Sequence, residues 1–116
     1  MAEHLRYEPI DPLSWDEVEE RVATGGPDLH KVPIAVSLYA DDPARALELL
    51  LTLATHEDGT VRGNALLGFG HLARRFRALP RERVDPLLQA GLSDPHPHVR
   101  RQAHYGLADV DHFAPH

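Results

Sequence analysis

The chain has 116 residues, the length of one domain, and its 12 basic and 18 acidic residues give a formal net charge of −6. This acidity argues against general nucleic-acid binding, and the absence of cysteine excludes disulfides, thiolate metal sites and cysteine nucleophiles. Leu and Ala are far more numerous than Val and Ile, which favours helices over strands. Residues 1–6 are not followed by the apolar core of a signal peptide, and no apolar run is long enough to cross a bilayer. We therefore expect a cytoplasmic, all-α domain that has no membrane partner.

Helix-start and helix-stop signals in the first half of the chain predict three helices joined by tight turns. Ser14-Trp15-Asp16-Glu17 has the S-x-x-E form of a capping box, and Gly25-Gly26-Pro27 ends the helix that it opens. A second helix is expected from residue 28 or 32 to Tyr39, with Pro33 in its first turn. Asp42-Pro43 opens a third helix, whose many leucines predict burial between neighbouring helices.

The second half of the chain repeats one pattern at a fixed interval, which is the separation between Val61 and Val99 and is called the repeat interval below. Its apolar spacing predicts helices at about 60–76, about 80–92 and about 97–113. A shift by the repeat interval matches the fourth helix to the sixth, placing Val61-Arg62 on Val99-Arg100, Ala65 on Ala103, Gly68 on Gly106, Phe69 on Leu107 and Leu72 on Val110. We therefore predict a single domain over 1–116, with helix pairs at 42–76 and 80–113 and a degenerate first pair at 14–40.

An Asp-containing turn, Val-Arg, an Ala three residues after the Arg, and then Gly before Phe or Leu occur twice, over 56–69 and 94–107. This pattern resembles the second helix of HEAT repeats. The resemblance implies a short right-handed α-solenoid of about three antiparallel helix pairs, whose second helices line a concave face. In that family the Arg often pairs with an Asp of an adjacent repeat, which gives inter-repeat roles to Arg62, Arg100, Asp58 and Asp94.

Glycines inside predicted helices indicate close helix packing. Gly68 and Gly106 share one repeat position, and each glycine in a helix interior costs roughly 0.5–1 kcal/mol relative to alanine. Close approach of a neighbouring helix is the simplest compensation. Replacing Gly68 by leucine is therefore expected to lower the free energy of unfolding by about 1–3 kcal/mol through overpacking. A thermal melt that Gly68→Leu leaves unchanged would place this position at the solvent.

Catalysis, metal binding and cofactor binding are not expected. His96 and His98 are two residues apart in a proline-rich turn, unlike the helical i,i+4 pairs that direct two imidazoles at one ion. His71 and Asp109 share a repeat position and could lie side by side, but no nucleophile is recognisably placed to complete such a site. The arginines at 74, 75, 77, 81 and 83 form a basic corner, interpreted as solvated or as a local site for an acidic group on a partner.

The predicted inner face mixes amide, aromatic and charged side chains, as protein-recognition surfaces do. The candidates for partner binding on this face are Asn64, Leu67, His71, Arg74, Gln102, Tyr105 and Asp109. At the acidic end of the chain, Trp15, Glu17, Tyr39 and Asp41 are further candidates, and Trp15 could equally cap the open end of the core.

Charge divides the chain into unequal halves. Residues 1–58 carry 13 acidic and 4 basic residues, net −9, whereas residues 59–116 carry 5 acidic and 8 basic residues, net +3. A small acidic chain of this kind looks like an immunity protein, which plugs the active site of a cognate toxin nuclease. The prediction is a non-enzymatic protein-binding module. There are two alternatives. One is a small HEAT-type enzyme, either a lyase or a DNA-glycosylase-like protein, and the other is a homo-oligomeric scaffold.

Overall fold

The computed structural model describes residues 10–116, and within that range the fold is all-helical with no strand. This confirms the expected all-α class. The elements are α1 (Trp15–Thr24), a 3-10 turn η2 (Leu29–Lys31), α2 (Val32–Tyr39), α3 (Pro43–Leu53), α4 (Gly59–Phe76), α5 (Arg81–Leu92) and α6 (Pro97–Phe113). No helix in the described part of the chain is both long and apolar enough to span a bilayer.

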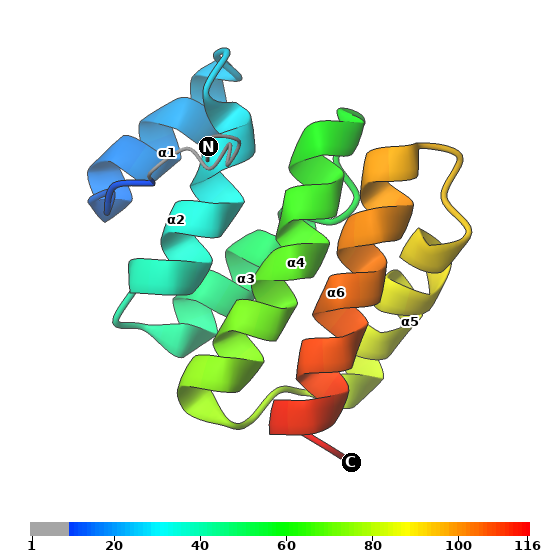
Figure 1. The fold of residues 1–116 in the computed structure, drawn as a ribbon. Helices are drawn as coiled ribbons and strands as arrows, with labels where there is room; N and C mark the ends of the chain where they lie inside the picture. Colours follow the sequence, from blue (N-terminus) through cyan, green and yellow to red (C-terminus); the bar gives the residue numbers. More distant parts are fainter. Residues whose placement is uncertain (1–9) are drawn as a thin grey trace, which may run out of the picture.

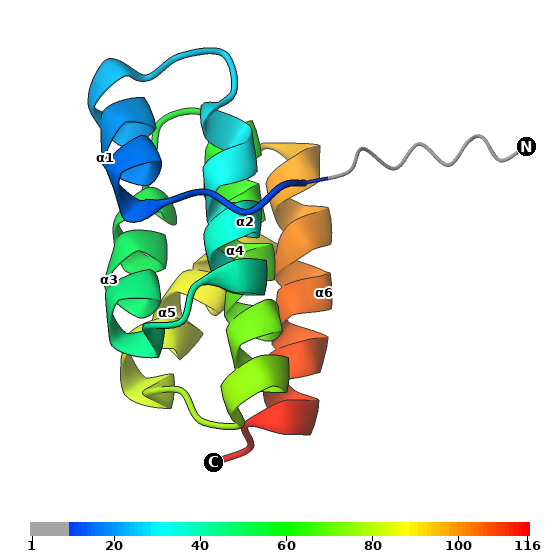
Figure 2. The ribbon, with the colours of Figure 1, turned by 90° about the vertical axis from the view of Figure 1, so that its left-hand side faces the viewer.

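The helices lie in two layers. In Figure 1, α2, α4 and α6 lie side by side toward the viewer, with α3 and α5 behind them. After a quarter turn, Figure 2 shows α1, α3 and α5 in one layer and α2, α4 and α6 in the other. α4 contacts α2, α3, α5 and α6, so it is the centre of the packing.

Side-chain caps at the first and third helices explain where these helices begin. Ser14 accepts a hydrogen bond from the backbone of Glu17, and the Glu17 carboxylate accepts one from the backbone of Ser14. This reciprocal capping box satisfies donors that the first turn leaves unpaired. Gly25 ends α1 in the left-handed conformation, with φ of 64°. Asp42 caps α3 by accepting from the backbone N–H of Arg45 at 3.0 Å.

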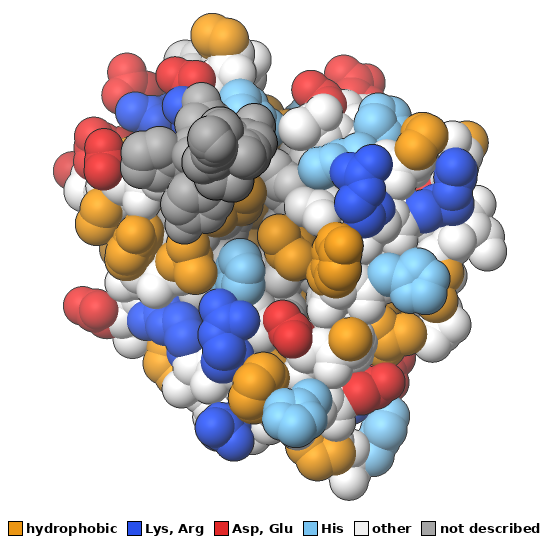
Figure 3. Space-filling model, in the orientation of Figure 1, with side chains coloured by type: hydrophobic (Ala, Val, Ile, Leu, Met, Phe, Trp, Pro, Cys, Tyr) orange, Lys and Arg blue, Asp and Glu red, His pale blue; other side chains and the backbone are white. Residues whose placement is uncertain are grey.

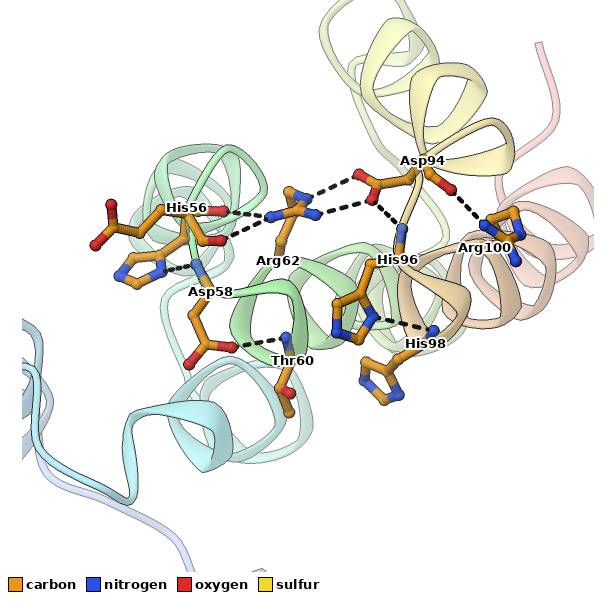
Figure 4. A network of polar contacts seen from close by, with 9 residues as sticks. His56, Asp58, Thr60, Arg62, Asp94, His96, His98 and Arg100 are labelled. Atoms are coloured by element: carbon orange, nitrogen blue, oxygen red, sulfur yellow. Dashed lines mark hydrogen bonds and ion pairs between the residues drawn. The ribbon is translucent and has the colours of Figure 1, made fainter.

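The turns before α4 and α6 use the same set of hydrogen bonds (Figure 4). His56 and Asp94 each accept from the backbone N–H two residues later, at 3.0 and 2.9 Å. Asp58 and His96 also each accept from the backbone N–H two residues later, and in this way they cap α4 and α6. Arg62 and Arg100 each donate to the carbonyl oxygen six residues earlier, at 2.8 and 2.7 Å. Residues separated by the repeat interval thus make equivalent contacts.

The core lies between the two layers, and α4 supplies much of it. Its apolar stripe is fully buried from Val61 to Leu72, with Phe69 at 0% exposure. The other layer contributes Ala46, Leu50 and Leu53 from α3 and Val84 and Leu88 from α5. The third helix was expected to be buried between its neighbours, and this expectation was only partly right. Leu47, Leu49 and Leu51 of α3 are half-buried, because α3 lies in the layer of α1, α3 and α5, where neighbours cover only part of its surface.

Glycine allows α4 and α6 to approach closely. A Cβ atom on Gly106 would lie 2.4 Å from the carbonyl oxygen of Leu66, and one on Gly70 would lie 3.3 Å from the Cα of Gly106. Gly106, rather than Leu107, is therefore the buried member of the α6 stripe. At Gly68 a Cβ would meet Leu50 at 3.1 Å and Ser37 at 3.2 Å, so this glycine faces packed side chains.

Candidate partner-binding face

A groove crosses the layer formed by α2, α4 and α6. It holds about 590 Å³ and is lined by Ile10, His30, Lys31, Ile34, Leu38, Tyr39, Thr60, Asn64, Leu67, His71, Arg74 and His98. Figure 3 shows this side of the molecule, on which apolar, cationic, acidic and imidazole groups are interspersed. Five of the predicted binding residues line the groove, namely Tyr39, Asn64, Leu67, His71 and Arg74.

Asn64 joins three elements at one end of the groove. Its amide nitrogen donates to the carbonyl oxygen of His30 at 2.8 Å, and its amide oxygen lies 2.9 Å from Nε2 of His98 and 3.1 Å from the amide nitrogen of Gln102. Asn64 is 4% exposed. Asn64 and the amide nitrogen of Gln102 thus make contacts within the fold, and the binding roles of these two residues stay predictions. Burial, followed by the charge of Arg101, lowers the pKa of His98.

A partly buried polar pair lies between α2 and α4. The Nδ1 atom of His71 is 2.9 Å from the hydroxyl of Ser37, and that hydroxyl also lies 3.1 Å from the carbonyl oxygen of Ile34. Burial of the His71 ring, followed by the charge of Arg74, lowers its pKa to about 4. His71 is therefore neutral at pH 7. Ser37 is 0% exposed, so its hydroxyl faces no solvent.

Asp109 pairs with an arginine rather than with His71. Its carboxylate lies 3.7 Å from Nη1 of Arg74, and its charge opposes the lowering of the His71 pKa. No hydrogen bond between His71 and Asp109 is present among the described side chains, so the two residues of the enzymatic alternative are neighbours without forming a dyad. The ring is held by Ser37 instead.

The remaining candidates on this face are exposed or half-buried. Tyr39 and Tyr105 are 45% and 58% exposed, and they are the exposed large hydrophobic residues of the described chain. Leu67 is half-buried in the groove, and Asp41 is exposed after the end of α2. Aromatic side chains in such positions can bury large areas on a partner at low entropic cost.

The acidic end of the chain presents a second, smaller groove between α1 and α3. It holds about 400 Å³, and its lining includes Trp15, Val22 and Leu49. The guanidinium carbon of Arg45 lies 4.2 Å from the centroid of the Trp15 ring. Trp15 therefore packs within the fold and also lines this groove. Glu17 is occupied by the capping box, and its hydrogen bonds with Ser14 lower the pKa of its carboxyl group.

Arg62 connects the turns before α4 and α6. Its Nε and Nη2 atoms donate to the two carboxylate oxygens of Asp94 at 2.9 and 2.8 Å (Figure 4), which lowers the pKa of Asp94 and raises that of Arg62. The structure places the other two proposed inter-repeat residues differently. Asp58 caps α4, and Arg100 contacts the backbone of its own turn.

The arginines of the predicted basic corner have separate partners. Arg75 donates to carbonyl oxygens at the end of α2, Arg77 stacks on Phe113, and Arg83 pairs with Glu48 of α3. Arg81 is buried and pairs with Asp85 and Asp111. Of the five, only Arg74 lines the groove, and a local site for an acidic group on a partner stays a prediction.

The comparisons with known proteins include a solved structure of similar fold. No family model and no curated protein matches the chain. Its fold is similar to that of a chain in the crystal structure of a CDI complex from Cupriavidus taiwanensis LMG 19424, with a TM-score of 0.79 and 25% sequence identity. The match covers 93% of this chain and 96% of that chain. The likeness therefore extends over nearly all of both chains.

Sequence reasoning missed two residues that shape the groove. Ser37 holds His71, and its signal was a lone serine in a mostly apolar helix, 32–39. His98 contacts Asn64, although the sequence singled it out only as a metal candidate beside His96. Within residues 10–116, no three His, Asp or Glu side chains are grouped so that they could hold a metal ion.

Proposed function

We propose that this protein is an immunity protein that binds and neutralises a cognate toxin, and that it has no catalytic activity of its own. The observation that carries this proposal is the structural likeness to a chain of a CDI complex over nearly the whole of both chains. CDI complexes pair a toxin with its immunity protein. The acidic charge of the chain supports the same partner class, because nuclease toxins must present cationic surfaces to their substrates.

We extend the proposal to the architecture, as a HEAT-like right-handed solenoid of three antiparallel helix pairs. The matched hydrogen bonds at 56–62 and 94–100 support it, because each residue and its counterpart one repeat interval later perform the same capping task. The bidentate contact between Arg62 and Asp94 supports it as well, since it ties two successive turns. In this arrangement α2, α4 and α6 are the second helices that carry the binding face.

The chemistry of the groove supports binding rather than catalysis. A general acid or base at neutral pH needs a pKa near that pH, whereas the pKa of His71 is lowered to about 4. The hydroxyl beside it belongs to Ser37, which is 0% exposed and cannot reach a substrate. The exposed tyrosines and the half-buried Leu67 instead provide the mixed surface that protein partners bind.

Neutralisation in cells tests the proposed function. The protein encoded by the reading frame next to this chain's gene is expressed from an inducible promoter, with and without this chain. We expect growth arrest alone and full rescue on co-expression, with a stable complex on size-exclusion chromatography of the purified pair. A toxin from an unrelated immunity pair is the specificity control. Continued growth arrest in the presence of the folded chain, or rescue without complex formation, would contradict the proposal.

Association with the toxin is expected to depend on salt. The net charge of −9 over residues 1–58 attracts a cationic partner, and added salt screens that attraction. We expect the association rate constant to fall roughly tenfold between about 50 mM and about 500 mM NaCl, with a much smaller change in the dissociation rate. Stopped-flow fluorescence measures both. The double variant Asp16→Asn/Glu20→Gln removes two exposed charges of α1 and should flatten the dependence. An unchanged association rate across this range would remove the steering argument.

A further inference from the structure

We propose that the groove between α2 and α4 receives a carboxylate side chain of the partner, which binds Arg74 and displaces Asp109 from it. This inference rests on the proposed function, because the partner is the toxin that the chain neutralises. It adds the position of the contact, the chemistry of the inserted group and a residue within this chain that competes with it.

The charge of the groove selects an anionic group. Although the chain carries 18 acidic residues, the described residues that line this groove include neither Asp nor Glu. They include two cations, Lys31 and Arg74, and the imidazoles of three histidines. Lys31 already has an acidic neighbour, since its Nζ lies 3.8 Å from the carboxylate of Asp28. A partner carboxylate would therefore meet complementary charge without a like charge in the lining.

The apolar part of the groove strengthens that attraction. Ile34, Leu38 and Leu67 contribute half-buried side chains to the lining, and they would be covered when a partner binds. Covering them removes water from the space around the guanidinium, and a charge pair is stronger when water is excluded. The expected insert is an Asp or Glu side chain carried by a segment with apolar neighbours.

Arg74 is the residue available for this contact. Its neighbour Arg75 is committed to the carbonyl oxygens of Ser37 and Ala40, at 3.0 and 2.8 Å. Arg74, in contrast, is 44% exposed and lies 3.7 Å from Asp109, which is longer than a charge-assisted hydrogen bond. Asp109 is itself 35% exposed. The pair is therefore loose and accessible, and a partner carboxylate can replace Asp109 in a shorter, bidentate contact.

The test uses two substitutions with opposite expected effects on toxin binding. Arg74→Gln removes the cation and should weaken binding about tenfold or more. Asp109→Asn keeps the size of the side chain but removes the internal competitor, and it should tighten binding about threefold to tenfold. The matched control is Arg101→Gln, an exposed cation of α6 outside the groove lining, which should change the dissociation constant less than about twofold. Isothermal titration calorimetry with nucleic-acid-free toxin measures all three.

The double variant separates direct from indirect effects. If Asp109 acts only by occupying Arg74, then Arg74→Gln/Asp109→Asn binds as weakly as Arg74→Gln alone. Thermal melts that match the wild type show that the variants are folded. Equal toxin affinities of Arg74→Gln and Arg101→Gln, or weaker toxin binding by Asp109→Asn than by the wild type, would overturn this inference. The proposed function would still stand in that case, provided that the wild-type chain binds the toxin. A wild-type chain that neither binds nor neutralises the toxin would overturn both.

Discussion

Replacing Gly106 by alanine is expected to lower the free energy of unfolding by about 3 kcal/mol, the upper end for overpacking a core. The added Cβ would lie 2.4 Å from the carbonyl oxygen of Leu66 and 3.1 Å from its carbonyl carbon. Because these are backbone atoms of α4, no side-chain rotation relieves the contact, and α4 and α6 must separate. The helix propensity of alanine returns only about 1 kcal/mol of that cost.

Urea denaturation followed by circular dichroism measures the effect of Gly106→Ala. The matched control is Gly26→Ala, because a Cβ at Gly26 meets no atom within 4 Å. The control should leave the midpoint nearly unchanged. If both variants unfold at the wild-type urea concentration, then α4 and α6 do not approach each other as closely as the structure shows.

Acidification from pH 7 to pH 5 is expected to reduce the free energy of unfolding by about 2 kcal/mol through His71 alone. The pKa of His71 is about 4 in the folded protein and 6.5 for an ordinary histidine, so the unfolded chain binds the proton first. This contribution is present above pH 6.5 and is lost as the pH falls through the folded pKa. The lowered pKa of His98 acts in the same direction.

The control for this pH dependence is a histidine outside the core. His71→Gln cannot titrate, so its stability should change much less between pH 7 and pH 5, although it starts lower because the contact with Ser37 changes. His104→Gln, at an exposed position of α6, should keep the wild-type slope. Carboxylates with lowered pKa values, such as Asp94, lose their stabilising contacts only at lower pH. A wild-type profile that is flat over this interval would contradict the burial of the His71 ring.

Local sequence signals predicted the features whose causes are local. The capping box of Ser14 and Glu17, the Asp42 cap and the glycine that ends α1 each involve residues within four positions of one another. The repeat interval also predicted close packing at Gly68 and Gly106, where an added Cβ would meet neighbouring atoms. Neither result required knowledge of how the helices are arranged in space.

Two polar contacts of the groove could not be predicted, because they join residues that are far apart in the sequence and that no repeat relates. Ser37 and His71 are 34 positions apart, as are Asn64 and His98, and neither pair follows the repeat interval. The partial exposure of the α3 leucines depends likewise on which layer the helix occupies. Composition shows that a helix is apolar but leaves open how many neighbours cover it.

The contact between Arg62 and Asp94 accounts for one of the residue differences between the two turns, namely His56 in the first and Asp94 in the second. The carboxylate of Asp94 accepts hydrogen bonds from Arg62. His56 occupies the position of Asp94 one repeat interval earlier, and the residue that corresponds there to Arg62 is Thr24, which carries no charge. A gene duplication of residues 56–93 would lengthen the chain by one unit, but the first Arg62 would then face a second His56. A change from histidine to aspartate in the new copy would restore this ion pair.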